Sequence, residues 1–464
     1  MPSRSLLLAL ALSTAIPVSA QPRNAAPAGP AALAVPFTQF TLPNGLHVIL
    51  HEDHTVPLAT VNVWYHVGSA REKPGRTGFA HLFEHLMFEG SKHVKEGEFD
   101  TLLEAAGGTN NGSTDTDRTN YYIDIPSNAL ELALFLESDR MGYLLDAMSP
   151  ERVNGQRDVV KNERRQGIEN APYGTASIEI DQLLYPEGHP YRWPTIGYME
   201  DLTAASYEDV TEFFKKYYAP GNASLVVAGD IDPAGVRVLI ENWFGDVKTG
   251  ATRVTPIDFP HPTLNEVKRK TIEDQVQLSR LYLTWLTAGH LKPGDAELDV
   301  VSQVLAGGKN SRLYKRLVYD MQIAQDVSAF QASAALGSTY QVVVTARPEE
   351  GMAAEALITR IRTIVDEEIA KLKAAPPTAR ELERAINQIE ASFYKGMESV
   401  GGFGGKGDRL NAYYFATGNP DYFNEDLARY RSLTSADIQA AVAFWLPVDR
   451  RVELVVTPAK GAAR

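Results

Sequence analysis

Residues 81–85 read His-Leu-Phe-Glu-His, and this motif constrains the chain more than any other feature. In a helix, residues four apart lie on one face, one turn above the other, so the imidazoles of His81 and His85 can reach one metal ion. Glu84 follows His81 by three residues and projects toward the same side. Two imidazoles with a carboxylate beside them suit a hydrolytic zinc site, and H-x-x-E-H is the inverted form of the H-E-x-x-H motif.

The residues around the motif favour a metal site over an ordinary half-buried helix, although a five-residue motif can also arise by chance. Of the ten histidines, only this pair falls on an otherwise apolar helical face, beside Phe79, Leu82 and Leu86. Burying two imidazoles and a carboxylate there costs free energy unless they satisfy one another or bind a metal. The motif therefore predicts a helix that presents metal ligands.

A third protein ligand is expected, because catalytic zinc usually has three protein ligands and a water. The best region is the helical run 150–170. Spacing alone leaves Glu151, Glu163 and Glu169 open as alternatives, and each of them could equally be a solvated carboxylate on a charged helix.

Several further segments accompany the motif, and together they resemble the pitrilysin-type (M16) zinc peptidases. The resemblance is to the short two-domain branch, which is similar to the beta subunit of mitochondrial processing peptidase and to bacterial periplasmic homologues. It covers nearly all of the chain after the leader. The matching segments are residues 42–45, 75–80, 81–90, 111–114, 117–122, 157–163 and 189–191.

The resemblance implies a fold, a site and an activity. The fold would be α+β, with two homologous domains that are each a mostly antiparallel β-sheet flanked by α-helices. Zn²⁺ would be held by His81, His85 and Glu163, and Glu84 would be the general base of a zinc endopeptidase that cleaves short or unfolded peptides. Asn111 would lie in an edge strand that pairs with the peptide substrate. The alternative for Asn111 is a turn residue.

Two departures from the family pattern affect the expected function. Gln156 stands where the family usually has a second glutamate, seven residues before the third ligand. The segment 337–344 lacks the arginine expected at its start, which favours a homodimer, or a heterodimer with a second M16-like chain that supplies the missing donors. The alternative function is therefore a non-catalytic or partner-dependent peptide-binding subunit. A zinc hydrolase acting on another substrate is a further alternative, but the intact motif favours a peptidase.

Composition excludes some classes of function. The net charge of −13 and the pI near 5.3 argue against nucleic acid as a partner and weakly favour basic or neutral peptides over acidic ones. The chain has no cysteine, so neither a thiolate metal site nor a cysteine nucleophile is possible. No stretch of the mature chain is long and apolar enough to span a membrane.

The N-terminus predicts export. Arg4 precedes an apolar run, residues 6–18, and Ala20 ends a small-residue cleavage site, so residues 1–20 are expected to be a signal peptide of a periplasmic or secreted protein. The expected organisation then follows along the chain. A flexible leader spans residues 21–35, an N-terminal zinc-binding catalytic domain 36–247, a linker 248–265 and a C-terminal inactive repeat domain 266–464.

The second half is expected to repeat the first without its ligands. Strands are expected at 40–51, 59–67, 121–125, 223–228 and 277–286, and helices at 78–88, 95–106, 128–145, 150–170, 207–216 and 296–305. Aligning Gly90 with Gly308 places the three motif residues on Asp299, Ser302 and Gln303. Chance similarity of two α+β halves is the alternative. Arg312 and Tyr314 are expected to cap and pack a helix, and residues 401–407 to form a loop between helices.

Overall fold

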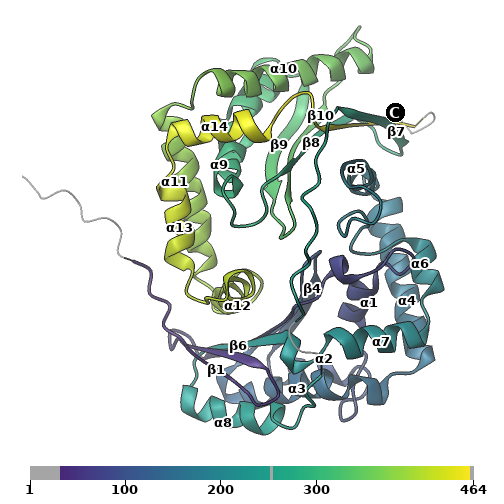
Figure 1. Cartoon of the computed structure of the whole chain (residues 1–464), viewed down its shortest axis with the longest axis vertical. Helices are drawn as coiled ribbons and strands as arrows, with labels where there is room; N and C mark the ends of the chain where they lie inside the picture. Colours follow the sequence, from purple (N-terminus) through teal and green to yellow (C-terminus); the bar gives the residue numbers. More distant parts are fainter. Residues whose placement is uncertain (1–31, 251–253, 460–464) are drawn as a thin grey trace, which may run out of the picture. The chain divides into compact units, whose positions relative to one another are not determined.

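The computed structural model describes residues 32–250 and 254–459 (Figure 1). The predicted signal peptide and most of the predicted leader lie outside the described residues. The first half of the chain forms a six-stranded sheet in the order β1-β2-β6-β3-β5-β4, in which only the β2–β6 pair is parallel. Its strands are β1 Thr38–Thr41, β2 His47–Glu52, β3 Leu58–Tyr65, β4 Thr109–Thr114, β5 Thr119–Pro126 and β6 Ala223–Gly229.

The second half forms a five-stranded sheet in the order β7-β11-β8-β10-β9, in which only the β7–β11 pair is parallel. Its strands are β7 Lys268–Asp274, β8 Arg280–Thr287, β9 Ala324–Ala332, β10 Ser338–Ala346 and β11 Val452–Pro458. This order repeats β2-β6-β3-β5-β4 strand for strand, with the parallel pair at the same place. The predicted α+β fold of two related halves is therefore confirmed.

Helices flank both sheets. Those of the first half are α1 Phe79–Leu86, α2 Glu98–Ala105, α3 Leu130–Ala147, α4 Pro150–Arg164, α5 Ala176–Leu184, α6 Met199–Ala204, α7 Tyr207–Tyr217 and α8 Pro233–Phe244. Those of the second half are α9 Asp295–Ala306, α10 Ala354–Ala374, α11 Ala379–Gly396, α12 Lys406–Thr417, α13 Phe423–Arg431 and α14 Ser435–Trp445. Short π-helical turns occur at Arg165–Glu169 and Tyr314–Asp320, and 3₁₀ turns at Ser69–Arg71, Ser127–Ala129 and Pro220–Asn222.

Local sequence explains where several helices begin. Ser206 caps α7 in a reciprocal capping box with Asp209, as its position before the helical run predicts. Ser149 caps α4, where Pro150 occupies the first helical position. The helix predicted at 150–170 ends its α-helical part at Arg164 and continues as a π-helical turn to Glu169.

One predicted strand is wrong in its extent. Residues 40–51 form two antiparallel strands, β1 and β2, and not one continuous strand. The chain turns between them, where the backbone N–H of Leu42 donates to the carbonyl of Leu46 at 2.9 Å and Gly45 adopts a positive φ of 95°. Only glycine adopts such a φ without strain.

The two halves exchange one helix each. Helix α12, from the second half, packs on β6 and β3 of the first sheet, and α5, from the first half, packs on β11 and β8 of the second sheet (Figure 1). The opposite face of the first sheet packs against α3. Strand β6 is accordingly buried along its whole length, which explains its continuous apolar run. The predicted boundaries at 247 and 266 stay predictions, and each half contributes a helix across them.

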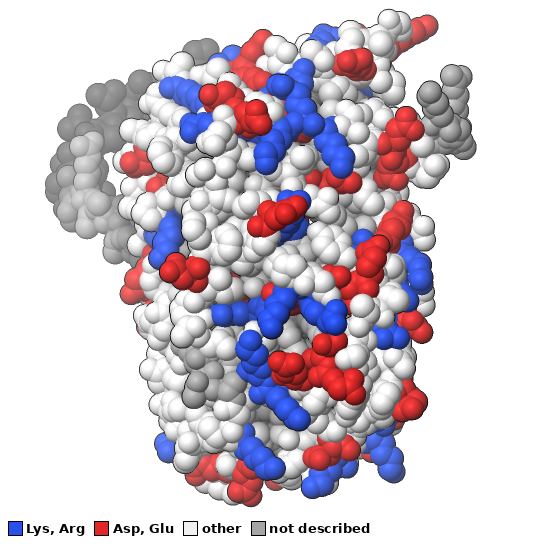
Figure 2. Space-filling view, turned by 45° about the vertical axis from the view of Figure 1, so that its right-hand side comes forward, with Lys and Arg blue, Asp and Glu red and all other residues white. Residues whose placement is uncertain are grey.

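Charge is mixed on the surface drawn in Figure 2, where basic and acidic side chains are interspersed over the face. Among the residues that the structure describes, no helix is both long enough and apolar enough to cross a bilayer.

Candidate metal centre

Helix α1 divides its residues between the core and the candidate site. Phe79, Leu82 and Phe83 are buried in the first core, whereas His81, Glu84 and His85 are only partly buried on another face. The helix begins after Gly78, and the carboxylate of Glu72 accepts the backbone N–H groups of Gly78 and Ala80 at 2.9 and 2.8 Å. A carboxylate at this end satisfies two of the donors that a helix leaves unpaired. The motif is therefore held on a firmly anchored helix.

Helix α4 brings Glu163 to the two histidines. Its Oε2 lies 3.2 Å from Nε2 of His85, and its Oε1 lies 3.8 Å from Nε2 of His81. The alternatives that spacing left open lie elsewhere. Glu151 starts the same helix, about 18 Å away along its axis, and Glu169 pairs with Arg164 at 2.8 Å.

The donor set fits a zinc ion. One donor atom each from His81, His85 and Glu163 lie within 4.8 Å of one another. Zinc with ligands at about 2.0–2.1 Å in tetrahedral geometry separates its ligand atoms by about 3.3 Å. Burial, with His85 nearby, lowers the pKa of His81 to about 4. Burial also lowers the pKa of His85, against the opposing effect of Glu163. Both imidazoles are then neutral at pH 7, as metal ligands must be.

Glu84 lies between α1 and the edge strand β4. Burial raises the pKa of Glu84, and the negative charge of Glu163 adds to that effect, whereas a hydrogen bond from Thr114 and the charge of Arg118 lower it. Gly112 of β4 packs directly on Glu84, since a Cβ built on this glycine would lie 3.0 Å from Cγ of Glu84. A partly buried carboxyl group beside the metal ligands can exchange a proton with a bound reactant.

Asn111 lies in β4, at the outer edge of the first sheet, and not in a turn. Its side chain is exposed, and its Oδ1 accepts the backbone N–H of Gly112 at 2.8 Å. Strand β4 pairs with β5 on one side only, so its other edge can accept a further strand. The role of Asn111 in substrate binding stays a prediction.

Among the described residues, Gln156 hydrogen-bonds Glu89 and none of the candidate metal ligands. Its Nε2 donates to Oε1 of Glu89 at 2.5 Å. The glutamine therefore neither orients His81 or His85 nor adds charge to them. Burial raises the pKa of Glu89, and nearby Glu96 raises it further.

In the second half, the positions aligned with the motif have structural roles. Asp299 accepts the hydroxyl of Tyr430 at 2.8 Å, and Ser302 donates to the carbonyl of Leu298 at 2.9 Å. Arg312 donates to both carboxylate oxygens of Glu381 near the start of α11, which agrees with its predicted capping and packing role. Within the described ranges, the one cluster able to hold a metal is that of the first half.

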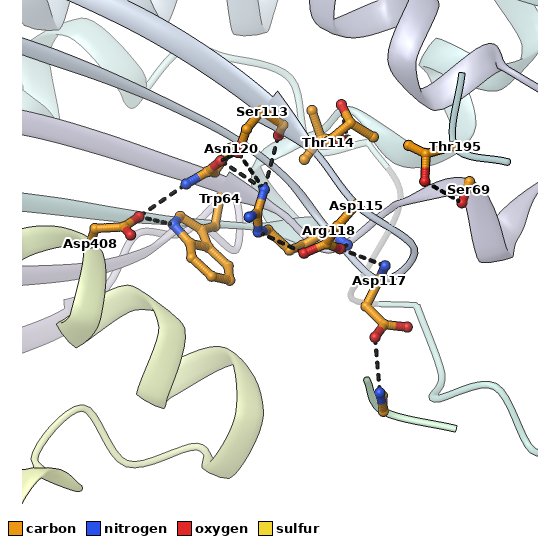
Figure 3. A network of polar contacts seen from close by, with 12 residues as sticks. Trp64, Ser69, Ser113, Thr114, Asp115, Asp117, Arg118, Asn120, Thr195 and Asp408 are labelled. Atoms are coloured by element: carbon orange, nitrogen blue, oxygen red, sulfur yellow. Dashed lines mark hydrogen bonds and ion pairs between the residues drawn. The ribbon is translucent and has the colours of Figure 1, made fainter. Parts of the chain in front are cut away.

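Arg118 is a site residue to which the sequence assigned no role. Its Nη1 donates to the carbonyl of Ser113 at 3.0 Å and to Oδ1 of Asn120 at 2.9 Å, and its guanidinium lies 5.0 Å from the ring centroid of Trp64. Asp408 of α12 accepts from Asn120 and from Trp64 at 2.9 and 3.0 Å (Figure 3). The signals in the sequence were an Asp-Arg pair between two expected strands and its place in the matching segment 117–122, whereas Asp408 lies too far along the chain to be foreseen.

Comparison with known proteins places the chain in a family. Residues 47–175 match the model described as insulinase (peptidase family M16), and residues 204–389 match the model of the peptidase M16 inactive domain. The zinc protease PqqE of Helicobacter pylori is 30% identical over 365 residues, which cover 77% of this chain and 80% of that protein. A probable mitochondrial-processing peptidase subunit beta of Arabidopsis thaliana is 24% identical, over 79% of this chain and 69% of that protein.

The similarity extends to solved structures. The crystal structure of a protease from Helicobacter pylori superposes with a TM-score of 0.82 at 26% identity, over 91% of this chain and 100% of that one. Both family models, the relatives and the duplicated sheet order agree. The chain therefore belongs to the M16 (insulinase) family of peptidases.

Proposed function

We propose that this chain is a zinc-dependent endopeptidase that hydrolyses short or unfolded peptides. The observation that carries the proposal is the convergence of His81, His85 and Glu163 from two helices, with Glu84 on the helix of the two histidines and packed against an open strand edge. Relatives named zinc proteases support the same reaction.

The chain's own residues would divide the work of the reaction. Bound zinc would polarise the scissile carbonyl and lower the pKa of water. Glu84 would accept the proton of the attacking water and later donate it to the leaving amine. Its raised pKa suits both steps, because the group must be charged for the first and protonated for the second.

Strand β4 would align the substrate. An extended peptide can add to its free edge through backbone hydrogen bonds, which give affinity without a strong sequence preference. Gly112 has no side chain at the point where this strand passes Glu84, so the peptide backbone and the carboxyl group can come close together.

The proposal includes export and a partner. Cleavage after Ala20 would release the mature chain into the periplasm or outside the cell. A second M16-like chain, identical or not, would supply donors for the substrate carbonyl, because Arg312 is paired with Glu381 and Tyr340 is fully buried. Of the longer Escherichia coli periplasmic protease PqqL, this chain covers 49%, so the fold also occurs within a longer chain.

A partner-dependent subunit without catalysis of its own is the second candidate. The contact of Gln156 with Glu89, and not with a histidine, favours it. The complete set of three ligands and a base favours the peptidase, because a subunit that only binds peptides does not need them.

The test is cleavage of quenched-fluorescent, unstructured peptides by the mature chain with zinc. We expect turnover that is lost in Glu84→Gln and retained in Glu104→Gln, a matched change on an exposed residue of α2. Wild-type turnover in Glu84→Gln would remove this residue as the base. If the wild type binds zinc and does not cleave, the partner-dependent subunit is the better account.

A further inference from the structure

A cavity of about 820 Å³ with a mixed polar and apolar lining begins at the end of the edge strand. Asp115 lines it and directly follows Thr114, the residue that hydrogen-bonds Glu84. Trp64 and Arg118 also line it from the first half, and Lys292 and Phe415 from the second half. The cavity is therefore next to the candidate metal centre but shares no ligand with it.

The carboxylates of the cavity wall are already engaged. Asp117 accepts the hydroxyl of Tyr191 at 2.7 Å and the backbone N–H of Ala335 at 2.9 Å. Asp115 accepts two backbone N–H groups and lies 3.2 Å from Nε of Arg118. Their acceptor oxygens are directed to the protein, so neither carboxylate is left to bind a cation in the cavity.

The cations of the wall exceed these carboxylates in number. The wall has three basic side chains, those of Arg71, Arg118 and Lys292, and two acidic ones, those of Asp115 and Asp117. Arg71 uses one donor on the carbonyl of Thr255 at 2.7 Å. Lys292 is exposed, and its amine has no hydrogen-bond or ion-pair partner among the described residues. The cavity is therefore locally basic, although the whole chain carries a net charge of −13.

Arg118 is held in a fixed orientation with donors to spare. Its Nη1 binds β4 and Asn120, its Nε faces Asp115, and its guanidinium lies over Trp64 (Figure 3). Asp408 in turn holds both Trp64 and Asn120. The Nη2 of Arg118 has no partner among the described residues, and the Arg118 side chain is 20% exposed. A fixed guanidinium with free donors is a good site for a carboxylate.

We propose that this cavity is a substrate subsite that binds a carboxylate of the peptide, either an acidic side chain or the C-terminal carboxylate. The proposal rests on the function proposed above and names its specificity. Asp115 lies three positions after Gly112, which is beside Glu84, so an extended peptide would reach the cavity about 10 Å, or three residues, from the cleaved bond. This reverses the weak preference for basic or neutral peptides that the net charge predicts.

The experiment measures peptide binding to the mature chain that carries Glu84→Gln and is loaded with zinc. The Glu84→Gln change removes the proposed base, so the peptide is bound but not cleaved. The probes are fluorescent ten-residue peptides with blocked ends that carry one glutamate at each position in turn, with matched glutamine peptides. A further pair differs only in a free or amidated C-terminus. Fluorescence anisotropy gives each affinity. Tighter binding of a glutamate peptide than of its glutamine counterpart identifies a site for an acidic side chain. Tighter binding of the free C-terminus than of the amidated one identifies a site for the C-terminal carboxylate.

We expect about tenfold tighter binding of the carboxylate peptide at one position or at the free C-terminus. Arg118→Gln should abolish this difference, and Lys292→Glu should reduce it about threefold. Lys292 is exposed, so its variant tests the site even if Arg118→Gln fails to fold. Lys309→Glu, a matched charge reversal on an exposed residue outside the cavity, should leave the difference unchanged.

Equal or undetectable binding of the carboxylate and neutral peptides would overturn the proposal. A difference that survives both Arg118→Gln and Lys292→Glu would place the carboxylate elsewhere and would also overturn it. Because binding is measured without cleavage, failure of this inference is distinct from failure of the peptidase. A chain that selects carboxylate peptides but never cleaves would retain the subsite and lose the proposed reaction.

Discussion

Gly112 and Glu84 pack so closely that a methyl group on Gly112 would have to displace Glu84 by a few tenths of an ångström. A Cβ built on Gly112 would lie 3.0 Å from Cγ of Glu84 and 3.1 Å from the ring of Tyr121. The edge strand therefore fixes the position of the carboxyl group beside the metal ligands. This contact couples substrate alignment to the position of the proposed base.

Gly112→Ala should lower kcat by about tenfold or more, because displacing a catalytic group by a fraction of an ångström disturbs its alignment. Zinc content should stay at the wild-type value, since no ligand is touched. The measurement is steady-state cleavage of a fluorescent peptide together with metal analysis. Gly155→Ala, on α4 where a Cβ meets nothing within 4 Å, is the control and should keep full activity. An unchanged kcat in Gly112→Ala would show that Glu84 tolerates displacement.

Glu137→Gln should reduce the free energy of unfolding by about 3 kcal/mol. Both Glu137 and Arg140 are almost fully buried in α3, and Nε of Arg140 donates to the carboxylate at 2.8 Å. The variant leaves a buried guanidinium without its counter-charge, although the ring of Tyr121 lies 4.3 Å from it. Urea unfolding gives the change. Asp146→Asn, exposed on the same helix, should stay within about 0.5 kcal/mol of the wild type. If Glu137→Gln also changed the free energy of unfolding by no more than about 0.5 kcal/mol, the buried ion pair would not stabilise the fold as stated.

The Arg312–Glu381 pair should make stability depend on acidity. The hydrogen bonds from Arg312 lower the pKa of Glu381 from its ordinary 4.5 to about 2, against the opposing effect of burial. A lowered carboxyl pKa stabilises the fold above pH 4.5, and this contribution is lost as the pH falls from 4.5 toward 2. The carboxyl group is partly exposed, so the contribution is about 1 kcal/mol.

Glu381→Gln should therefore destabilise the chain at pH 7 and have much less effect at pH 3, because glutamine keeps the capping box with Thr378. Urea unfolding at the two pH values measures the difference. Glu383→Gln, an exposed change on the same helix, should show no such dependence. An equal loss at both pH values would mean that the ion pair does not contribute.

Local patterns were enough to predict much of the fold. The apolar face of α1, the cap at Ser206 and the turn after α11 follow from spacing and residue type within one element. The continuous strand predicted at 40–51 was wrong because it ran through Pro43-Asn44-Gly45, a sequence typical of a turn. The positive φ of Gly45 and the hydrogen bond from Leu42 to Leu46 show that turn.

Contacts between distant segments could not be predicted in the same way. Helical spacing placed His81, Glu84 and His85 on one face, but the packing of α4 on α1 is what brings Glu163 to them. The exchange of α5 and α12 between the two sheets leaves no mark on either helix alone. The same holds for Arg118, whose orientation depends on a chain of contacts that ends in the other half.

Metal content tests the central claim, that His81, His85 and Glu163 hold one zinc ion. The measurement is zinc per chain after dialysis for the wild type, Glu163→Ala, Glu151→Ala and Glu169→Ala, with circular dichroism as a check of folding. We predict about one zinc per chain in the wild type and in both control variants, and a clear loss in Glu163→Ala. Full zinc occupancy in Glu163→Ala, or its loss in Glu151→Ala or Glu169→Ala instead, would contradict the account.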